Sequence, residues 1–195
     1  MNEPGIREVL EEILRVNRNK KSIIIGIDGC GGAGKSTYAQ KLRDHYHGEL
    51  PASIVHMDDF YLPSNRRGDE NDGIGVNFDW RRLLDQVLIP IKNHTDGFYQ
   101  RYDWNKDALD DWHRVPIGLL VVEGVYALRQ ELVDYYDYSI WIETDFSTRL
   151  ARGIERDGEN MRHTWEEVWM PAEQKYVELE QPHEKADLII DGSGR

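Results

Sequence analysis

The sequence has a single cysteine and no long apolar run. Cys30 is the only cysteine among 195 residues, so no internal disulfide can form, and we expect a reducing compartment. The longest apolar stretches, at 23–27 and 117–122, are each interrupted by glycine and fall far short of a membrane-spanning helix. The N-terminal segment also lacks the apolar core of a secretory signal. These absences predict a cytoplasmic protein with no membrane partner.

A net positive charge is also lacking. The chain has 24 basic against 36 acidic residues, which gives a formal net charge of −12. Binding nucleic acid through its phosphates needs a basic face, so we expect no nucleic-acid partner. A local basic cluster can still bind a small anionic ligand. The length fits a single domain over 1–195, and a homo-oligomer is left open.

Short apolar segments alternate with amphipathic ones along the chain. Apolar residues at helical spacing predict a helix over 4–18, and other patterns predict helices over 36–47, 79–92, 128–135, 145–156 and 163–180. Strands are predicted over 22–28, 53–58, 117–123, 138–143 and 186–191, and the aromatic-rich segment 95–116 is expected to be irregular. This alternation predicts an α/β fold of three layers, with a mostly parallel five-stranded sheet and helices on both faces.

The first predicted strand runs into a glycine-rich motif. Residues 29–37 read Gly-Cys-Gly-Gly-Ala-Gly-Lys-Ser-Thr and fit G-x-x-x-x-G-K-[ST], the P-loop, in its strand-to-helix context. Its amides and Lys35 would hold phosphates, and the Ser36 hydroxyl would bind Mg²⁺. Cys30 is interpreted as a small filler of the loop. The predicted ATP-binding residues are Gly29, Gly31, Gly32, Ala33, Gly34, Lys35, Ser36 and Thr37.

A P-loop alone does not name a reaction, because switches, motors and kinases share it. The segment 105–108, Asn-Lys-Asp-Ala, approaches the guanine-reading N-K-x-D pattern of GTPases and fails it. A small domain with this loop is typical of a small-molecule kinase, which needs carboxylates for the attacking hydroxyl and the metal. Asp58 and Glu123 end two predicted strands, and such strand ends face one crevice.

Motifs spread along the chain resemble one family. Asp58-Asp59-Phe60-Tyr61, Asn77-Phe78-Asp79, Tyr102-Asp103, Val122-Glu123-Gly124 and Thr148-Arg149-Leu150 follow the P-loop in the order seen in uridine kinases. The chain is thus similar to the phosphoribulokinase/uridine kinase family of P-loop kinases. The resemblance implies transfer of the γ-phosphoryl group of ATP, with Mg²⁺, to the 5′-hydroxyl of a nucleoside-like substrate. It implies that Asp58 is the base, that Asp79 holds the ribose, that Tyr102 lies by the nucleobase, and that Glu123 lies near Mg²⁺.

The sequence also departs from that pattern. Uridine kinases have a histidine a few residues after the Tyr-Asp pair, where this chain has Asp107. Nicotinamide riboside kinases share Asp58-Asp59-Phe60 and a V-W-P segment similar to Val168-Trp169-Met170-Pro171. A kinase for nicotinamide riboside or another small metabolite is therefore the alternative substrate assignment. From another class, the chain could be a non-catalytic ATP-binding regulatory module.

Three segments are predicted to border the acceptor. Arg149, Arg152 and Arg156 share one helix face, which indicates either a solvated face or a lid over about 145–162 that stabilises the transferred phosphoryl group. A polar flap over about 62–77 and the segment 95–116 complete the border. Tyr61 and Trp104 are expected to contact the acceptor as aromatic walls. Asp59 would only cap its loop or order water near the metal.

Overall fold

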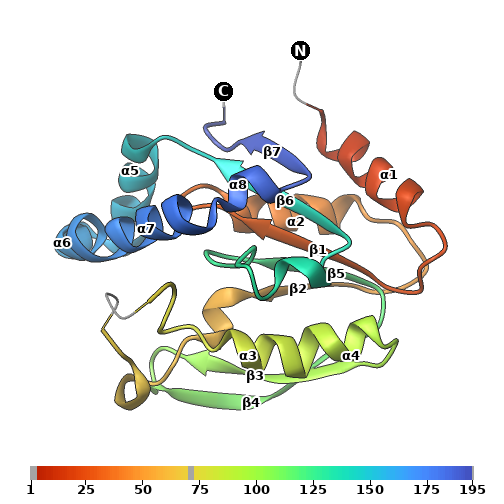
Figure 1. Cartoon of the computed structure of the whole chain (residues 1–195), viewed down its shortest axis with the longest axis horizontal. Helices are drawn as coiled ribbons and strands as arrows, with labels where there is room; N and C mark the ends of the chain where they lie inside the picture. Colours follow the sequence, from red (N-terminus) through yellow and green to blue (C-terminus); the bar gives the residue numbers. More distant parts are fainter. Residues whose placement is uncertain (1–3, 70–72, 195) are drawn as a thin grey trace.

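A five-stranded parallel sheet forms the centre of the molecule (Figure 1). The structure, a computed structural model, describes residues 4–69 and 73–194. The strands are β1 (Ile23–Asp28), β2 (Ala52–His56), β5 (Leu119–Glu123), β6 (Tyr138–Glu143) and β7 (Leu188–Asp191). Their order is β2-β5-β1-β6-β7, and each neighbouring pair is parallel. The predicted three-layer α/β fold is confirmed.

Side chains alternate between the two faces of the sheet and build two cores. On one face, Ile23, Ile25 and Ile27 pack with α1 (Ile6–Val16) and α2 (Lys35–His45). On the other, Ile24 belongs to a core formed with the helical run 80–92 and with Tyr176. Strands buried on both faces need mostly apolar residues, which is why β1 and β5 read as apolar runs.

The predicted helix 79–92 forms as one run of three parts. It comprises α3 (Trp80–Leu83), a π-helical turn (Leu84–Leu88) and α4 (Ile89–Lys92). Asp79 caps its start, because its carboxylate accepts a hydrogen bond from the Arg82 N–H at 3.3 Å. This cap satisfies one of the amides that the first helical turn leaves without a partner.

The expectation that 95–116 is irregular is wrong. The segment forms an antiparallel hairpin of β3 (Gly97–Asp103) and β4 (Ala108–Val115), which lies beyond α3 and α4 as seen from the main sheet (Figure 1). Tyr99 and Tyr102 are buried, whereas Phe98 and Trp112 are exposed. The pairing register shifts between Gln100 and Tyr102, so a bulge breaks the alternation by which a strand is recognised.

The prediction of a helix over 128–135 is also wrong. Only Val133–Tyr135 is helical, as a single 3₁₀ turn. The segment is held instead by separate anchors: the Leu128 N–H donates to the buried Asp28 carboxylate at 2.7 Å, and Leu132 is fully buried. Its apolar residues suggested a helix, but each is placed by tertiary contacts.

The C-terminal third is mostly helical. Helix α5 (Phe146–Asp157) is followed by a 3₁₀ turn (Glu159–Met161) and by one continuous run. That run comprises α6 (Arg162–Thr164), a π-helical segment (Trp165–Trp169) and α7 (Met170–Glu180), after which α8 (Pro182–Lys185) leads into β7. The predicted helices 145–156 and 163–180 are thus present. In the described part of the chain, no helix combines the length and apolarity that crossing a membrane requires.

Candidate active site

The glycine-rich loop joins β1 to α2 and packs directly on α5. Gly32 and Gly34 have φ values of 77° and 104°, a region that side chains rarely adopt. A Cβ on Gly32 would lie 2.5 Å from the Arg149 carbonyl oxygen, so only glycine allows this approach. Lys35 opens α2, and its ammonium donates to the Cys30 carbonyl at 3.0 Å. Burial raises the pKa of the Cys30 thiol to about 12, which disfavours the thiolate form.

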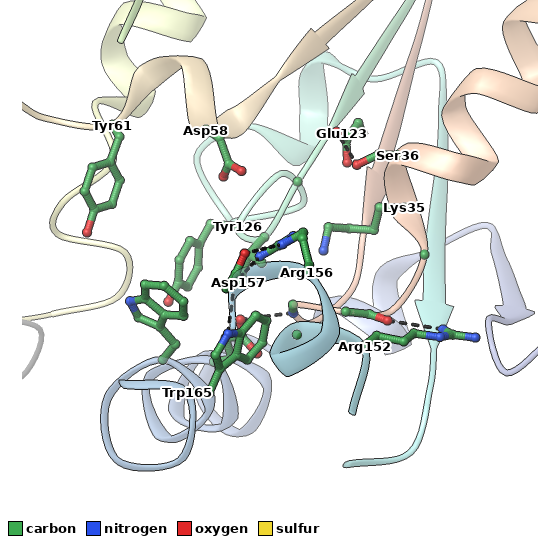
Figure 2. Close-up of a pocket in the computed structure, with 18 of the residues that line it drawn as sticks. Lys35, Ser36, Asp58, Tyr61, Glu123, Tyr126, Arg152, Arg156, Asp157 and Trp165 are labelled. Atoms are coloured by element: carbon green, nitrogen blue, oxygen red, sulfur yellow. Dashed lines mark hydrogen bonds and ion pairs between the residues drawn. The ribbon is translucent and has the colours of Figure 1, made fainter. Parts of the chain in front are cut away.

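A cavity of about 740 Å³ lies beside this loop. Figure 2 shows Lys35, Asp58 and Glu123 pointing into it from different elements. The cavity brings together most of the residues predicted for the site: Gly31, Gly32, Gly34, Lys35, Ser36, Thr37, Asp58, Tyr61, Trp104, Glu123, Arg152 and Arg156. Gly29, Ala33, Asp79, Tyr102 and Arg149 are outside its lining. The strand-end crevice expected from the sequence therefore contains the predicted phosphate, metal and base residues.

The pair predicted to hold the metal lies in contact. Ser36 Oγ donates to Glu123 Oε1 at 3.0 Å, and His56 Nδ1 also hydrogen-bonds this oxygen. His56 faces Glu123 because the two residues are register partners at the ends of β2 and β5. Burial alone would raise the pKa of Glu123, but the His56 hydrogen bond and the Lys35 charge outweigh it and lower that pKa. An ionised carboxylate beside a serine hydroxyl offers the hard oxygen donors that Mg²⁺ prefers.

Asp58 does not end a strand, contrary to expectation. Strand β2 stops at His56, and Asp58 lies in the 3₁₀ turn Met57–Phe60 that follows. Its carboxylate faces the open cavity, so water reaches it, while the surrounding protein still desolvates it. This desolvation raises the pKa of Asp58, against the opposing charge of Lys35. A carboxylate whose pKa is raised is a stronger acceptor for a proton.

Asp59 has a different environment from its neighbour. Its carboxylate accepts a hydrogen bond from the Tyr99 hydroxyl at 2.8 Å and lies 3.6 Å from the Arg101 guanidinium. Both partners belong to β3, so Asp59 fastens the hairpin to the turn that carries Asp58. It is not among the residues lining the cavity.

Aromatic side chains form much of the cavity wall. Tyr61 stacks on Trp104 with ring centres 4.8 Å apart, and the Arg67 guanidinium lies 4.6 Å from the centre of the Tyr61 ring. Trp104 is 57% exposed, so much of its surface can meet a ligand. The remaining aromatic lining residues are Phe78, Tyr126, Trp165 and Trp169. Such walls suit a planar ring system.

Two residues predicted to bind the acceptor have other partners. The Tyr102 hydroxyl donates to Asp107 at 2.6 Å and accepts from Arg67 at 2.5 Å. Asp79 caps α3 and lies 3.8 Å from the Arg82 guanidinium. Tyr102 still packs edge-on against Trp104, with ring centres 4.8 Å apart, so it supports the aromatic wall from behind.

The flap predicted over 62–77 is anchored where the structure describes it; residues 70–72 lie outside that part. Asp107, at the hairpin tip, accepts from the Ser64 N–H at 2.8 Å, and the Gly68 N–H donates to the Asn77 side chain at 2.9 Å. Arg67 donates to the Leu62 carbonyl at 2.8 Å. These contacts fix the flap against the tip of the hairpin.

The three predicted lid arginines have separate positions. Arg156 and Arg152 line the cavity, and Arg152 also donates to the Gly32 and Gly192 carbonyls at 3.2 and 2.9 Å. Arg149 is buried and pairs with Glu173 at 3.1 Å. The helix α5 therefore presents two of its arginines to the cavity and uses the third for internal packing.

Several residues near the site were not predicted from the sequence. Asp157 accepts from Arg156 at 2.7 Å and from the Trp165 indole at 3.0 Å, and both Asp157 and Trp165 line the cavity (Figure 2). Glu173 reaches the phosphate loop from α7. Only His56 carries a sequence signal that could have revealed it, because it lies two residues before the end of the predicted strand 53–58.

Comparisons with known proteins agree on one family. The model of the phosphoribulokinase/uridine kinase family matches residues 24–193. A uridine kinase of Halobacterium salinarum is 30% identical over 184 residues, covering 87% of this chain and 80% of its own. A uridine kinase of Limosilactobacillus reuteri is 27% identical over 196 residues, covering 93% and 88%.

Solved structures share the fold. A possible uridine kinase from Bacillus stearothermophilus superposes with a TM-score of 0.70 at 20% identity, covering 95% of this chain and 99% of that one. The D-glycerate 3-kinase from Cryptococcus neoformans superposes with a TM-score of 0.59 at 17% identity, covering all of this chain and 91% of that one. At these identities the likeness concerns the fold alone. The family match over nearly the whole chain is decisive: the protein belongs to the phosphoribulokinase/uridine kinase family.

Proposed function

We propose that the protein is an ATP-dependent kinase that transfers the γ-phosphoryl group to the 5′-hydroxyl of a nucleoside. One observation carries this proposal: Asp58, the phosphate loop and an aromatic wall share a single cavity. A nucleotide-binding switch needs the loop but has no use for a carboxylate facing an open, aromatic acceptor space. The relatives that are uridine kinases support the nucleoside as acceptor.

In this proposal the loop binds the donor. The loop amides from Gly32 to Ser36 would surround the phosphate chain, and the Lys35 ammonium would contribute a full positive charge. Lys35 donates to the Cys30 carbonyl in this structure, a contact that a phosphate oxygen would replace. Lys35 is 8% exposed, so its charge acts in a setting of reduced solvent screening.

Ser36 and Glu123 fit Mg²⁺, because their oxygens lie 3.0 Å apart at the edge of the phosphate loop. When bound, the ion would neutralise charge on the transferred phosphoryl group. Glu123 supplies the ionised carboxylate, and His56 keeps it turned toward Ser36 by its own hydrogen bond.

Asp58 would orient the acceptor hydroxyl and accept its proton. Desolvation by the surrounding protein raises its pKa, which makes it a better proton acceptor than a fully solvated aspartate. Asp58, Tyr61 and Trp104 line the same cavity, so the sugar would lie near Asp58 and the base against Trp104. Arg152 and Arg156 line the cavity from α5 and would stabilise the charge on the phosphoryl group.

An acceptor screen tests the proposal. Release of ADP from Mg-ATP is measured with uridine, cytidine, nicotinamide riboside and pantothenate, with Lys35→Met as the matched control. We expect a nucleoside to stimulate ADP release strongly and Lys35→Met to abolish it. Stimulation by nicotinamide riboside alone would assign the alternative substrate, and ATP binding without stimulation by any acceptor would indicate the regulatory module.

A further inference from the structure

Helix α7 sends two buried side chains to the phosphate loop and its approach. Glu173 and Tyr176 lie three residues apart, on one helix face, with 6% and 0% exposure. Glu173 accepts from the Gly31 N–H at 3.0 Å, and the Tyr176 hydroxyl donates to Asp28 at 2.8 Å. Asp28 directly precedes the loop and accepts from the Gly29 N–H at 2.6 Å. Helix α7 therefore holds the loop at its entry and at its third residue.

Glu173 also connects the loop to α5. Its second oxygen accepts from the buried Arg149 at 3.1 Å. The backbone of Arg149 touches Gly32, where a Cβ would lie 2.5 Å from the Arg149 carbonyl. A Cβ on Gly31 would lie 2.8 Å from Glu173 Oε1, so the carboxylate is packed against the loop as well as hydrogen-bonded to it. Loop, α5 and α7 thus form one packed unit around a single carboxylate.

Such a contact matters because the loop is rich in glycine. Gly32 and Gly34 already have positive φ values, and glycine loses more conformational freedom on ordering than any other residue. If the loop is already ordered before the ligand arrives, the binding step does not include the conformational-entropy cost of ordering it. The charge of Glu173 is compensated by Arg149, so it can order the loop without acting as an isolated negative charge.

We propose that Glu173 is a positioning residue that keeps the phosphate loop, through the Gly31 N–H, in the conformation that receives the nucleotide phosphates, and that couples it to α5 through Arg149. The inference rests on the proposed nucleotide binding by this loop. A contrary account treats the carboxylate as an internal anion that occupies a phosphate position and must leave. The two accounts predict opposite changes in nucleotide affinity for Glu173→Gln: the positioning role predicts weaker binding, and the internal anion predicts tighter binding.

The test compares the dissociation constant for ADP with Mg²⁺ in the wild type, in Glu173→Gln and in the control Glu178→Gln. Glu178 is exposed on the same helix and accepts a hydrogen bond from the Gln174 side chain at 2.9 Å. A glutamine has one acceptor oxygen and cannot serve both Gly31 and Arg149. We expect Glu173→Gln to weaken binding by about tenfold, the cost of one charge-assisted hydrogen bond, and the control to match the wild type.

Unchanged or tighter ADP binding in Glu173→Gln would overturn the inference. A lower melting temperature of the variant would not rescue it, because a purely structural residue lowers stability without weakening ADP binding. Amide hydrogen exchange of residues 30–34, measured without nucleotide, gives a second readout. It should become faster in Glu173→Gln, and unchanged exchange would also overturn the inference. A wild type that binds no ADP would overturn the proposed function and this inference together, whereas equal binding by wild type and variant overturns the inference alone.

Discussion

Asp28 should make the protein less stable as pH rises from 4.5 to 7. It is fully buried, accepting from the Leu128 N–H at 2.7 Å and from Tyr176 at 2.8 Å. Burial raises its pKa from 3.8 to about 6, against those hydrogen bonds and the Lys35 charge. A raised folded-state pKa means that the folded chain keeps a proton that the unfolded chain has released. The contribution of Asp28 to folding stability is therefore fully present below pH 3.8. It is lost as the pH rises from 3.8 to about 6.

The magnitude follows from the two pKa values. Each pKa unit corresponds to about 1.4 kcal/mol, so between pH 4.5 and pH 7 Asp28 should cost the folded state about 2 kcal/mol. The variant Asp28→Asn removes this titration. It also misplaces a donor against a backbone amide, but that cost is the same at both pH values and cancels in the comparison.

The assay is urea unfolding of the wild type and Asp28→Asn at pH 4.5 and pH 7. We expect the free energy of unfolding of Asp28→Asn, relative to that of the wild type, to be about 2 kcal/mol higher at pH 7 than at pH 4.5. Other carboxylates titrate equally in both proteins. A difference that stays constant with pH, or moves in favour of the wild type, would refute the account of Asp28.

Three further predictions concern the surroundings of the cavity. Gly153→Ala should destabilise the chain by about 1–3 kcal/mol in thermal unfolding, because its Cβ would lie 2.5 Å from the Trp165 ring; an unchanged melting temperature would argue against that packing. Tyr99→Phe should cost about 1 kcal/mol by losing the 2.8 Å bond to Asp59, while kcat stays at the wild-type value; a large drop in kcat would mean that Asp59 acts in the reaction. Trp104→Ala should raise the acceptor KM about tenfold or more with the ATP KM unchanged, and equal effects on both would contradict its place in the acceptor wall.

The sheet and the phosphate loop could be predicted because their signals are local. Strands buried on both faces must be mostly apolar, and the loop needs glycine wherever its backbone meets α5 or a phosphate. Parallel strands end at one edge, so Glu123 and the phosphate loop could be expected to share a crevice from their positions alone. Asp58 reached the same cavity although its strand ended two residues early.

The hairpin and the inner contacts could not be read from the sequence. A bulge between Gln100 and Tyr102 shifts the side-chain alternation midway through β3. Helical spacing placed Arg149 on one face with Arg152 and Arg156. The spacing does not show which part of that face is buried by a helix that comes later in the sequence. Glu173 comes from 24 residues farther along the chain and decides this by pairing with Arg149.

The roles of the two adjacent aspartates were separable only through tertiary contacts. Both follow β2 at consecutive positions, and the sequence favoured Asp58 through the family resemblance and through a strand boundary that proved incorrect. The structure separates them by partner: Asp58 faces the cavity, whereas Asp59 bonds Tyr99 and lies near Arg101 on the hairpin. Because that hairpin was not predicted, the partners of Asp59 could not be either.

The most direct test of the account is acceptor-stimulated ADP release by Asp58→Asn, with Asp59→Asn as the matched control. Asparagine keeps the size of the side chain and removes its ability to accept a proton. We expect Asp58→Asn to bind ADP like the wild type and to lose about 10²–10⁴-fold in kcat, while Asp59→Asn retains most of the activity. Full turnover by Asp58→Asn, or an equal loss in both variants, would contradict phosphoryl transfer at Asp58 in this cavity.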